Sequence, residues 1–446
     1  MTTRLALGVD LGSSGARVAL MAANSDGAAD GQAAGSPRHL FEAGLAYPGP
    51  FADPRAWRAA LLQLAAAIPS HWRGQIGAIA LDGTSGTLLL CQPDGRLLPP
   101  PHHLALPYHQ ACPKEADAAA AIAGAGPAGS ASGSLARALQ LLRRAEASGL
   151  RGPWLLRHQA DWLMGWLLGD WRWGEEGNNL RLGWDLQHNA WCGSIAAQSW
   201  APCLPVIQPS GRVLGRLSPA AAATLQLPDD CRVVSGSTDA NAGVLAAAPG
   251  EGDGIAVLGT TLVLKRFVEQ PLQGPGISCH RVAGRWLLGG ASNAGAGILR
   301  RFYDDAQIAR LSRQIDPDRP SGLELRPLPA RGERFPSDDP DLEPILGPRP
   351  VSDALYLQAL LEGLTRLEAA GWKRLEELGM PPLQRVISLG GGARNPQWRR
   401  LRQRALGVPV LNRPALSAAR GMALLALTAL AAAPGGADAA DPASHA

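Results

Sequence analysis

Two segments far apart in the chain share one design: an apolar strand, a tight turn of small and hydroxyl residues, and a second apolar strand. The first spans residues 5–21 around the turn LGSSG, and the second spans residues 255–264 around Gly259, Thr260 and Thr261. Apolar runs joined by such turns predict β-hairpins. The backbone amides and hydroxyls of the second turn can point one way and hold a phosphate. The chain is therefore expected to use this hairpin design twice.

The length and composition predict two globular domains. At 446 residues, the chain exceeds what one hydrophobic core usually serves. A hydrophobic content of 46%, with 53 glycines and 37 prolines, is typical of a globular α/β enzyme. We expect one domain over residues 1–248, a second over 249–433, and a disordered tail of Ala, Gly, Asp and Pro over 434–446. A cleft between two such domains is a natural active site.

Charge, cysteine spacing and hydropathy exclude several classes of protein. The formal net charge of +4 comes from scattered arginines, which does not demand a nucleic-acid partner. The one dense arginine group lies on a predicted helix and is expected to be a solvated face; it comprises Arg399, Arg400, Arg402 and Arg404. The six cysteines show neither CxxC nor zinc spacing, which is typical of free thiols in a reducing cytoplasm. No apolar stretch is long enough to span a membrane, so we expect a soluble, cytoplasmic protein.

Two aspartates stand where phosphoryl transfer needs acids. Asp239 opens a short Ala-rich helix over residues 240–248, where nearby amides favour its ionised form, so it can accept a proton. A base close to a phosphate-holding turn is what transfer to a hydroxyl requires. Asp10 ends the first strand and suits a magnesium ion held largely through water. The plainer alternatives are a helix-capping aspartate beside an ordinary hairpin, and a first turn that is only structural.

Further polar residues follow other predicted elements. A strand over residues 76–81 ends at Asp82, with Thr84 shortly after; this is either a ligand-binding strand end or a simple terminator. In the tryptophan-dense stretch 154–200, Asn178 and Asn179 either line a sugar pocket or form a turn. The Ala/Gly/Ser-rich stretch 116–133 has GxGxxG spacing but follows no strand, so we interpret it as a flexible connection.

The late segment RVISLGGGARNPQW predicts a strand, a glycine turn and a helix start. The bare backbone of residues 390–392 lets a ligand approach closely, and the helix start can face polar ligand atoms. Asn395 and Trp398 lie three residues apart and could present an amide and an aromatic face to a nucleobase. The alternative for Trp398 is core packing.

Together, these pieces resemble the FGGY carbohydrate kinases of the actin-like, sugar-kinase and heat-shock ATPase superfamily. The matching strings occur in family order and are GVDLGSSGAR (8–17), ALDGTSGTLLL (80–90), GSTDA (236–240), LGTTLVLK (258–265), GGASNAGAG (289–297) and LGGGARN (389–395). The resemblance implies an α/β fold with two ribonuclease-H-like domains flanking a catalytic cleft. It also implies an N-terminal sugar-binding domain, a C-terminal nucleotide-binding domain, and the cofactors ATP and Mg²⁺.

The resemblance also implies roles at matching positions. Asp239 would be the general base that takes the proton from the attacking sugar hydroxyl, and Asp10 would serve magnesium and the transferring phosphate. The sugar would be held by Asp10, Ser14, Gly15, Thr84, Asn179 and Asp239. The nucleotide would be held by Ser13, Gly259, Thr260, Thr261, Gly391, Gly392, Asn395 and Trp398.

The absence of GxxxxGK[ST] excludes a P-loop kinase as far as motifs can. Xylulose kinases of the family tend to carry Gln-Met-His where this chain has residues 83–85, Gly-Thr-Ser. The strings DGTSGT and NNLRLGWD look more like the D-ribulose-kinase-like, xylulokinase-like branch, although Glu176 and Gly177 replace that branch's Asp-Tyr pair. The expected substrate is D-ribulose, giving D-ribulose 5-phosphate. The alternatives are D-xylulose, or a non-kinase regulatory protein that hydrolyses ATP on the same fold.

Overall fold

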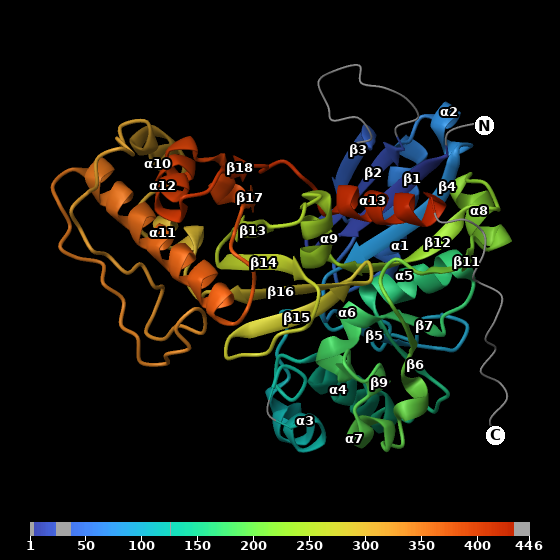
Figure 1. Cartoon of the computed structure of the whole chain (residues 1–446). Coiled ribbons are helices and arrows are strands. Elements are labelled where there is room, and N and C mark those ends of the chain that lie inside the picture. Colours follow the sequence, from blue (N-terminus) through green and yellow to red (C-terminus); the bar gives the residue numbers. More distant parts are fainter. Residues whose placement is uncertain (1–3, 24–36, 125, 432–446) are drawn as a thin grey trace. The chain divides into compact units, whose positions relative to one another are not determined.

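The computed structural model describes residues 4–23, 37–124 and 126–431 (Figure 1). By its internal contacts, the chain divides into two compact units. The first comprises Met1–Ala246, Arg281–Gly284 and Ser417–Ala446, and the second comprises Ala247–His280 and Arg285–Leu416. The expected boundary after residue 248 lies close to the end of the first long segment. The helix over Ala418–Ala431 belongs to the first unit, and the expected tail over 434–446 lies outside the described residues.

A six-stranded mixed sheet forms the centre of the first unit, in the order β11-β12-β4-β1-β2-β3. Its strands are β1 (Leu5–Leu11), β2 (Gly15–Ala22), β3 (Arg38–Ala46), β4 (Ile76–Gly83), β11 (Val213–Arg216) and β12 (Arg232–Thr238). Strand β2 runs antiparallel to β1 and β3, whereas β4 and β12 run parallel to β1. The carboxyl ends of β1, β4 and β12 therefore meet at one edge.

Large and small residues alternate along β1, so the two faces of this sheet pack against different helices. The large residues of β1, such as Leu7 and Val9, face a core shared with α1 (Pro54–Ala67), α5 (Gln159–Leu168) and α8 (Pro219–Leu225). The small residues face α13 (Ala418–Ala431), which lies against the blue strands in Figure 1, beside α9 (Asp239–Ala246). A Cβ at Gly8 would lie 1.9 Å from the carbonyl oxygen of Ala419, so the missing side chain lets the helix approach the strand. This close packing holds the C-terminal helix to the N-terminal sheet.

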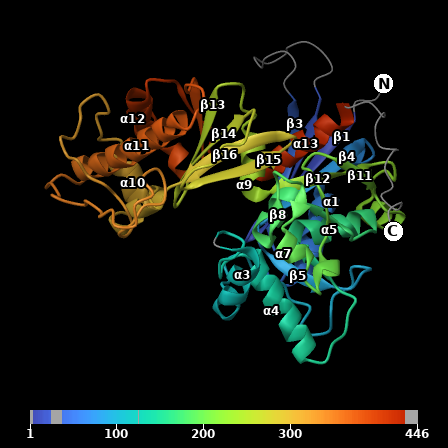
Figure 2. The same cartoon turned by 60° about the horizontal axis from the view of Figure 1, so that its bottom comes forward.

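The first unit has a second, smaller hydrophobic core against α4 (Ser134–Ala147). Figure 2 shows this helix with α3 (Ala116–Ala123) and α7 (Gly193–Ala196) nearby. The expectation of a flexible connection over 116–133 was therefore wrong for its first half. Alanine is the best helix former, and Ala119 is buried against this core. The remaining short elements of the unit are α2 (Ser70–Arg73), β5 (Leu88–Cys91), β6 (Leu155–His158), β7 (Trp173–Glu175), α6 (Glu176–Asn179), β8 (Trp184–Asp185), β9 (Ala190–Trp191) and β10 (Val206–Gln208).

The second unit repeats the arrangement of the first. Its sheet has the order β15-β16-β14-β13-β17-β18, formed by β13 (Asp253–Leu258), β14 (Leu262–Val268), β15 (Ile277–Val282), β16 (Arg285–Ala291), β17 (Arg385–Leu389) and β18 (Val410–Asn412). Strand β14 is antiparallel to β13 and β16, and β17 is parallel to both β13 and β18. Each unit thus contains an antiparallel hairpin whose first strand also pairs in parallel with a later strand of the sheet. The predicted α/β fold with two ribonuclease-H-like domains is confirmed.

Three helices cover the second sheet: α10 (Asp305–Ser312), α11 (Asp353–Glu377) and α12 (Pro396–Leu406). Residues 316–350 form isolated bridges without a helix or strand, as their prolines predict. The prediction that the arginine group forms a solvated face was wrong for Arg402. This residue is fully buried and pairs with Glu368. Arg402 lies one turn after Trp398, on the helix face that packs inward. None of the described helices is long and apolar enough to cross a membrane.

Candidate active site

Three aspartates gather at the edge where β1, β4 and β12 end. Asp10 on β1 is the register partner of Asp82 on β4, and Ser237 on β12 is the partner of Asp82 on the other side. Asp239 follows two residues later, as the first residue of α9. Parallel strands end on the same side, so the chain brings together acids from residues 10, 82 and 239. This is the strand-end position at which α/β proteins bind ligands.

Asp82 is the most deeply buried of the three acids, with no exposed surface. Neither of its carboxyl oxygens accepts a hydrogen bond from a donor in the described part of the chain. Burial raises the pKa of Asp82 well above its usual value, and the negative charges of Asp10 and Asp239 raise it further. Burial also raises the pKa of Asp10, opposed by its contact with Asp82 and by Arg17. Asp82 is therefore expected to hold its proton to a higher pH than an exposed aspartate does.

Asp239 is half-buried at the amino end of α9. Its Oδ1 accepts a hydrogen bond from the amide of Ala240 at 2.7 Å, at the amino end of α9. The Thr238 hydroxyl accepts from the amide of Asn241 at 3.4 Å, which caps the same helix. The helix-capping geometry predicted from the sequence is therefore present, and the carboxylate keeps an exposed side.

Thr84, a predicted sugar contact, belongs to a buried polar network beside the acids. Its hydroxyl donates to Oε1 of Gln159 at 2.8 Å and lies 2.7 Å from the hydroxyl of Thr87. Gln159 Nε2 donates to the Tyr47 hydroxyl at 3.3 Å, and that hydroxyl donates to the carbonyl of Gly12 at 2.8 Å. Burial and the nearby charges of Asp10 and Asp82 raise the pKa of Tyr47. The network ties the β1–β2 turn to the end of β4.

The predicted residues of the β1–β2 turn have different surroundings. Ser13 and Ser14 are exposed at the tip of the turn, where their hydroxyls can reach a ligand. Gly15 pairs with Ala46 of β3, and a Cβ there would lie 2.2 Å from the carbonyl oxygen of Leu45. Gly15 is thus required by the close approach of β3.

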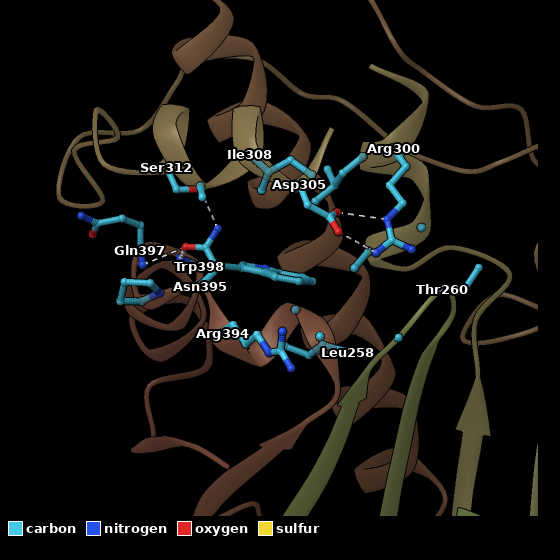
Figure 3. Close-up of a pocket in the computed structure, with 18 of the residues that line it drawn as sticks. Leu258, Thr260, Arg300, Asp305, Ile308, Ser312, Arg394, Asn395, Gln397 and Trp398 are labelled. Carbon is cyan, nitrogen blue, oxygen red and sulfur yellow. Dashed lines mark hydrogen bonds and ion pairs between the residues drawn. The ribbon is translucent and has the colours of Figure 1, made fainter. Parts of the chain in front are cut away.

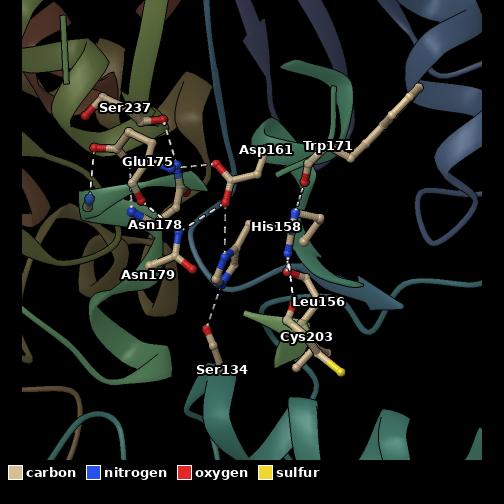
Figure 4. Close-up of polar contacts among 12 residues, drawn as sticks. Ser134, Leu156, His158, Asp161, Trp171, Glu175, Asn178, Asn179, Cys203 and Ser237 are labelled. Atoms are coloured by element: carbon tan, nitrogen blue, oxygen red, sulfur yellow. Dashed lines mark hydrogen bonds and ion pairs between the residues drawn. The ribbon is translucent and has the colours of Figure 1, made fainter. Parts of the chain in front are cut away.

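Asn179 lies in a fully buried polar cluster, drawn in Figure 4. Its Nδ2 donates to Asp161 Oδ2 at 3.1 Å and to the carbonyl of Glu175 at 2.8 Å. The neighbouring Asn178 donates through Nδ2 to Glu175 Oε2 at 2.9 Å and to the carbonyl of Ser237 at 3.3 Å. Asn178 therefore supports the end of β12 that leads to Asp239. Within the described residues, the Oδ1 atoms of both asparagines have no hydrogen-bond donor.

In the second unit, a cavity of about 700 Å³ opens where β13 and β17 end (Figure 3). The predicted nucleotide residues that line it are Gly259, Thr260, Gly391, Gly392, Asn395 and Trp398. Thr261 follows Thr260 in the same turn but is not among the lining residues. The volume is typical of small-molecule sites. Most of the predicted nucleotide-binding residues of this unit therefore surround one cavity.

The turn at Gly259 is held by the segment that follows β16. The amide of Ala296 donates to the carbonyl of Gly259 at 2.8 Å, and the amide of Gly297 donates to that of Thr260 at 3.3 Å. A Cβ at Gly295 would lie 2.5 Å from the carbonyl oxygen of Thr260. The small residues of GGASNAGAG thus let the chain pack on this turn while Thr260 remains exposed.

The side chains of Asn395 and Trp398 are more constrained than expected. Asn395 Oδ1 accepts from the amides of Gln397 and Trp398 at 3.0 Å each, and its Nδ2 donates to Ser312 Oγ at 2.8 Å. Trp398 is buried, and its Nε1 donates to Thr365 Oγ1 at 3.1 Å. The amide is therefore committed to capping α12, and the indole is part of the core as well as of the cavity wall.

Several lining residues were not predicted. Asp305, Ile308, Ser312 and Arg313 come from α10 and the residue after it, and Figure 3 shows the first three across the cavity from Arg394. Arg300 pairs with Asp305 at 3.1 Å. The signal that could have revealed α10 is the capping box of Asp304 and Gln307, which is present in the structure.

Residues 254–430 match the family model described as "FGGY family of carbohydrate kinases, C-terminal domain". This part of the chain is similar to the C-terminal domain of the FGGY carbohydrate kinases. The match supports a sugar kinase, an enzyme that transfers phosphate to an alcohol group of a carbohydrate. The match lies at the cavity-bearing half and includes β13, the Gly259 turn and the glycine turn after β17.

Solved structures resemble this chain over nearly its whole length. A xyloylose kinase from Brucella ovis matches with a TM-score of 0.77 and 21% identity, covering 97% of this chain and 92% of that one. A xylulose kinase from Rhodospirillum rubrum matches with a TM-score of 0.75 and 22% identity, covering 98% and 91%. A gluconate kinase from Lactobacillus acidophilus matches with a TM-score of 0.73 and 16% identity, covering 96% and 90%. At these identities, the comparisons show the shared fold.

Proposed function

We propose that this protein is an FGGY carbohydrate kinase that phosphorylates a ketopentose, with D-ribulose as the first candidate and D-xylulose as the second. The observation that supports this best is the meeting of Asp10, Asp82 and Asp239 at one strand-end edge of the first unit. The product from D-ribulose would be D-ribulose 5-phosphate. Use of ATP suits a cytoplasmic enzyme.

Asp239 is the proposed general base. Its half-exposed carboxylate lies at the amino end of α9 and can take the proton from the sugar hydroxyl as that oxygen attacks the phosphate. Ser14, Gly15, Thr84 and Asn179 are the other proposed sugar residues. Thr84 is the one whose hydroxyl is already engaged by Gln159, so we assign it to shaping the pocket as much as to direct contact.

Asp10 is the proposed magnesium residue. Within the described ranges, no group of three or more His, Cys, Asp or Glu could hold a metal ion by itself. Magnesium often uses one or two carboxylates and completes its shell with water and substrate phosphates, which fits Asp10 at this strand-end edge. When bound, the ion would neutralise charge on the transferring phosphate.

The cavity of the second unit is the proposed ATP site. Gly259, Thr260 and Thr261 would hold the nucleotide phosphates with Ser13. Gly391, Gly392, Asn395 and Trp398 would line the adenosine pocket. In this proposal, the domain over residues 1–248 binds sugar and the domain over 249–433 binds nucleotide.

A coupled ADP-release screen over pentuloses, hexuloses and polyols tests the substrate proposal. We expect the highest kcat/KM with D-ribulose, and the product mass should be that of a phosphopentose. ADP release with free phosphate as the only product would favour the ATP-hydrolysing alternative. Preference for a hexulose or a polyol would contradict the ketopentose assignment.

A further inference from the structure

The start of α4 carries a buried arginine that forms no ion pair with a carboxylate of the described residues. Arg137 has no exposed surface, and its Nε donates to the carbonyls of Pro107 and Gln110 at 3.1 Å each. Its Nη2 donates to the carbonyl of Tyr108. Among the described residues, Nη1 has no partner. Three nitrogen–carbonyl contacts thus fix the guanidinium and leave one nitrogen available.

A second arginine adds positive charge at the same place. Arg181 is half-buried, and its Nη2 donates to the carbonyl of Ser132 at 2.6 Å and to the Ser132 hydroxyl at 3.1 Å. Its buried Nε has no partner in the described part of the chain. Burial and the charge of Arg181 lower the pKa of Arg137 to about 10, so the two guanidinium groups lie close enough to repel. A negative group between them would relieve this repulsion.

The helix and its surroundings add further attraction for an anion. α4 runs over Ser134–Ala147, begins without a side-chain cap and has no acidic residue in its first turn. Its amino end therefore keeps the positive end of the helix dipole. A Cβ at Gly86 would lie 3.2 Å from Arg137 Nη1 and 3.4 Å from Ser134 Oγ, so the free nitrogen points at bare backbone. Ser132 and Tyr108, whose backbone carbonyls accept hydrogen bonds from the two arginines, are exposed at the surface.

We propose that Arg137, Arg181 and the start of α4 form a binding site for a small oxyanion, a carboxylate or a phosphate. Guanidinium groups bind both anions through charge-assisted hydrogen bonds, and helix amino ends bind them through the dipole and backbone amides. The site adjoins the proposed sugar residues, because the amide of Tyr108 donates to Thr87 Oγ1 at 3.1 Å and Thr87 contacts Thr84.

The anion has two possible sources. It is either the carboxylate of the acceptor itself, which makes the acceptor a sugar acid, or a free oxyanion that binds beside a neutral sugar. The first source rests on the proposed kinase function and changes its substrate class. The second does not depend on which sugar is phosphorylated.

Thermal unfolding with sodium phosphate, against sodium chloride at equal ionic strength, tests the site itself. We expect phosphate to raise the Tm of the wild-type chain specifically. Arg181→Gln should weaken the apparent affinity by roughly tenfold, because one charge-assisted donor is lost. The matched control is Arg212→Gln, an exposed arginine of the same unit, which should respond like the wild type. Equal responses to phosphate and chloride, or an unchanged response in Arg181→Gln, overturn the proposal.

Kinase assays then separate the sources. The site belongs to the acceptor if the enzyme phosphorylates a sugar acid such as an aldonate. In that case phosphate should compete with the sugar acid, and Arg181→Gln should raise the KM for it. Phosphorylation of neutral ketopentoses only, with phosphate changing kcat or KM in the wild type and not in Arg181→Gln, assigns it to a free oxyanion. Absence of ADP release with every sugar contradicts the proposed function, while the unfolding experiment still decides the anion site. If Arg181→Gln fails to fold, Arg137→Lys, which keeps the charge but changes the donor geometry, takes its place with the same expected loss.

Discussion

Asp10 and Asp82 are register partners on adjacent parallel strands, and burial raises the pKa of both carboxyl groups. Two carboxyl groups in a buried site repel each other when both are ionised. We therefore expect Asp82, the more buried residue, to keep its proton. This pair occupies the strand-end edge at which we propose sugar phosphorylation. The arrangement sets a pH dependence that can be measured.

Replacement of Asp82 by asparagine should change how stability depends on pH. The pKa of Asp82 is raised in the folded chain, so the unfolded chain releases its proton more readily. The stabilisation from protonated Asp82 is complete below the usual aspartate pKa and is lost as pH rises toward the raised folded value. Relative to Asp82→Asn, the wild type should lose stability as pH rises from about 4. Urea unfolding of both proteins across this range measures the difference. Parallel curves of unfolding free energy against pH would contradict the raised pKa of Asp82.

Gly8→Ala should destabilise the first unit. The new Cβ would lie 1.9 Å from the carbonyl oxygen of Ala419, so α13 must move away from β1. Overpacking of this kind costs about 2 kcal/mol. The control is Gly243→Ala in α9, where a Cβ meets nothing within 4 Å, and there we expect no loss because alanine is the better helix former. Equilibrium unfolding of both variants tests the docking of α13, and equal stabilities would contradict it.

Two neighbouring glycines should separate ligand binding from folding. A Cβ at Gly391 meets nothing within 4 Å and lies at the cavity wall, so Gly391→Leu should fill the cavity and raise KM for ATP by at least about tenfold without loss of Tm. A Cβ at Gly392 would lie 2.5 Å from the Trp398 ring, so Gly392→Ala should lower Tm. An unchanged KM in Gly391→Leu would show that ATP does not use this cavity.

Glu368→Gln should destabilise the second unit strongly. It leaves the fully buried guanidinium of Arg402 without its carboxylate, at a cost of about 3–5 kcal/mol. The comparison is Asp318→Asn, which removes the exposed pair with Arg400 and should cost less than about 1 kcal/mol. Denaturant unfolding measures both losses, and similar values for the two variants would contradict the burial argument.

Local patterns predicted much of this structure. Both hairpins and the strand ends at Asp10 and Asp82 are encoded within short segments, because apolar runs and turn residues are neighbours in the sequence. The positions of Gly391 and Gly392 at the cavity could be predicted for the same reason, because the glycine turn is also a local pattern. Helix capping by Asn395 is also a local signal, but its amide can serve either a helix or a ligand, and the sequence does not say which.

The missed features depend on contacts between distant residues. Tyr47 and Gln159 meet beside Asp10 only after separate segments have packed on the first sheet. The docking of α13 joins residues near opposite ends of the chain, and α10 reaches the cavity through tertiary packing. Arg402 was misjudged because charge predicts exposure, whereas Glu368 allows its burial.

The most direct measurement compares single-turnover phosphorylation by the wild type, Asp239→Asn and Asp239→Ala, with ATP binding followed separately. Our account predicts that both variants lose the proton acceptor and slow phosphate transfer by at least about a hundredfold. ATP should bind all three proteins with similar Kd, because the proposed nucleotide cavity belongs to the second unit. Transfer at the wild-type rate by Asp239→Asn would contradict Asp239 as the base and, with it, the proposed catalytic edge.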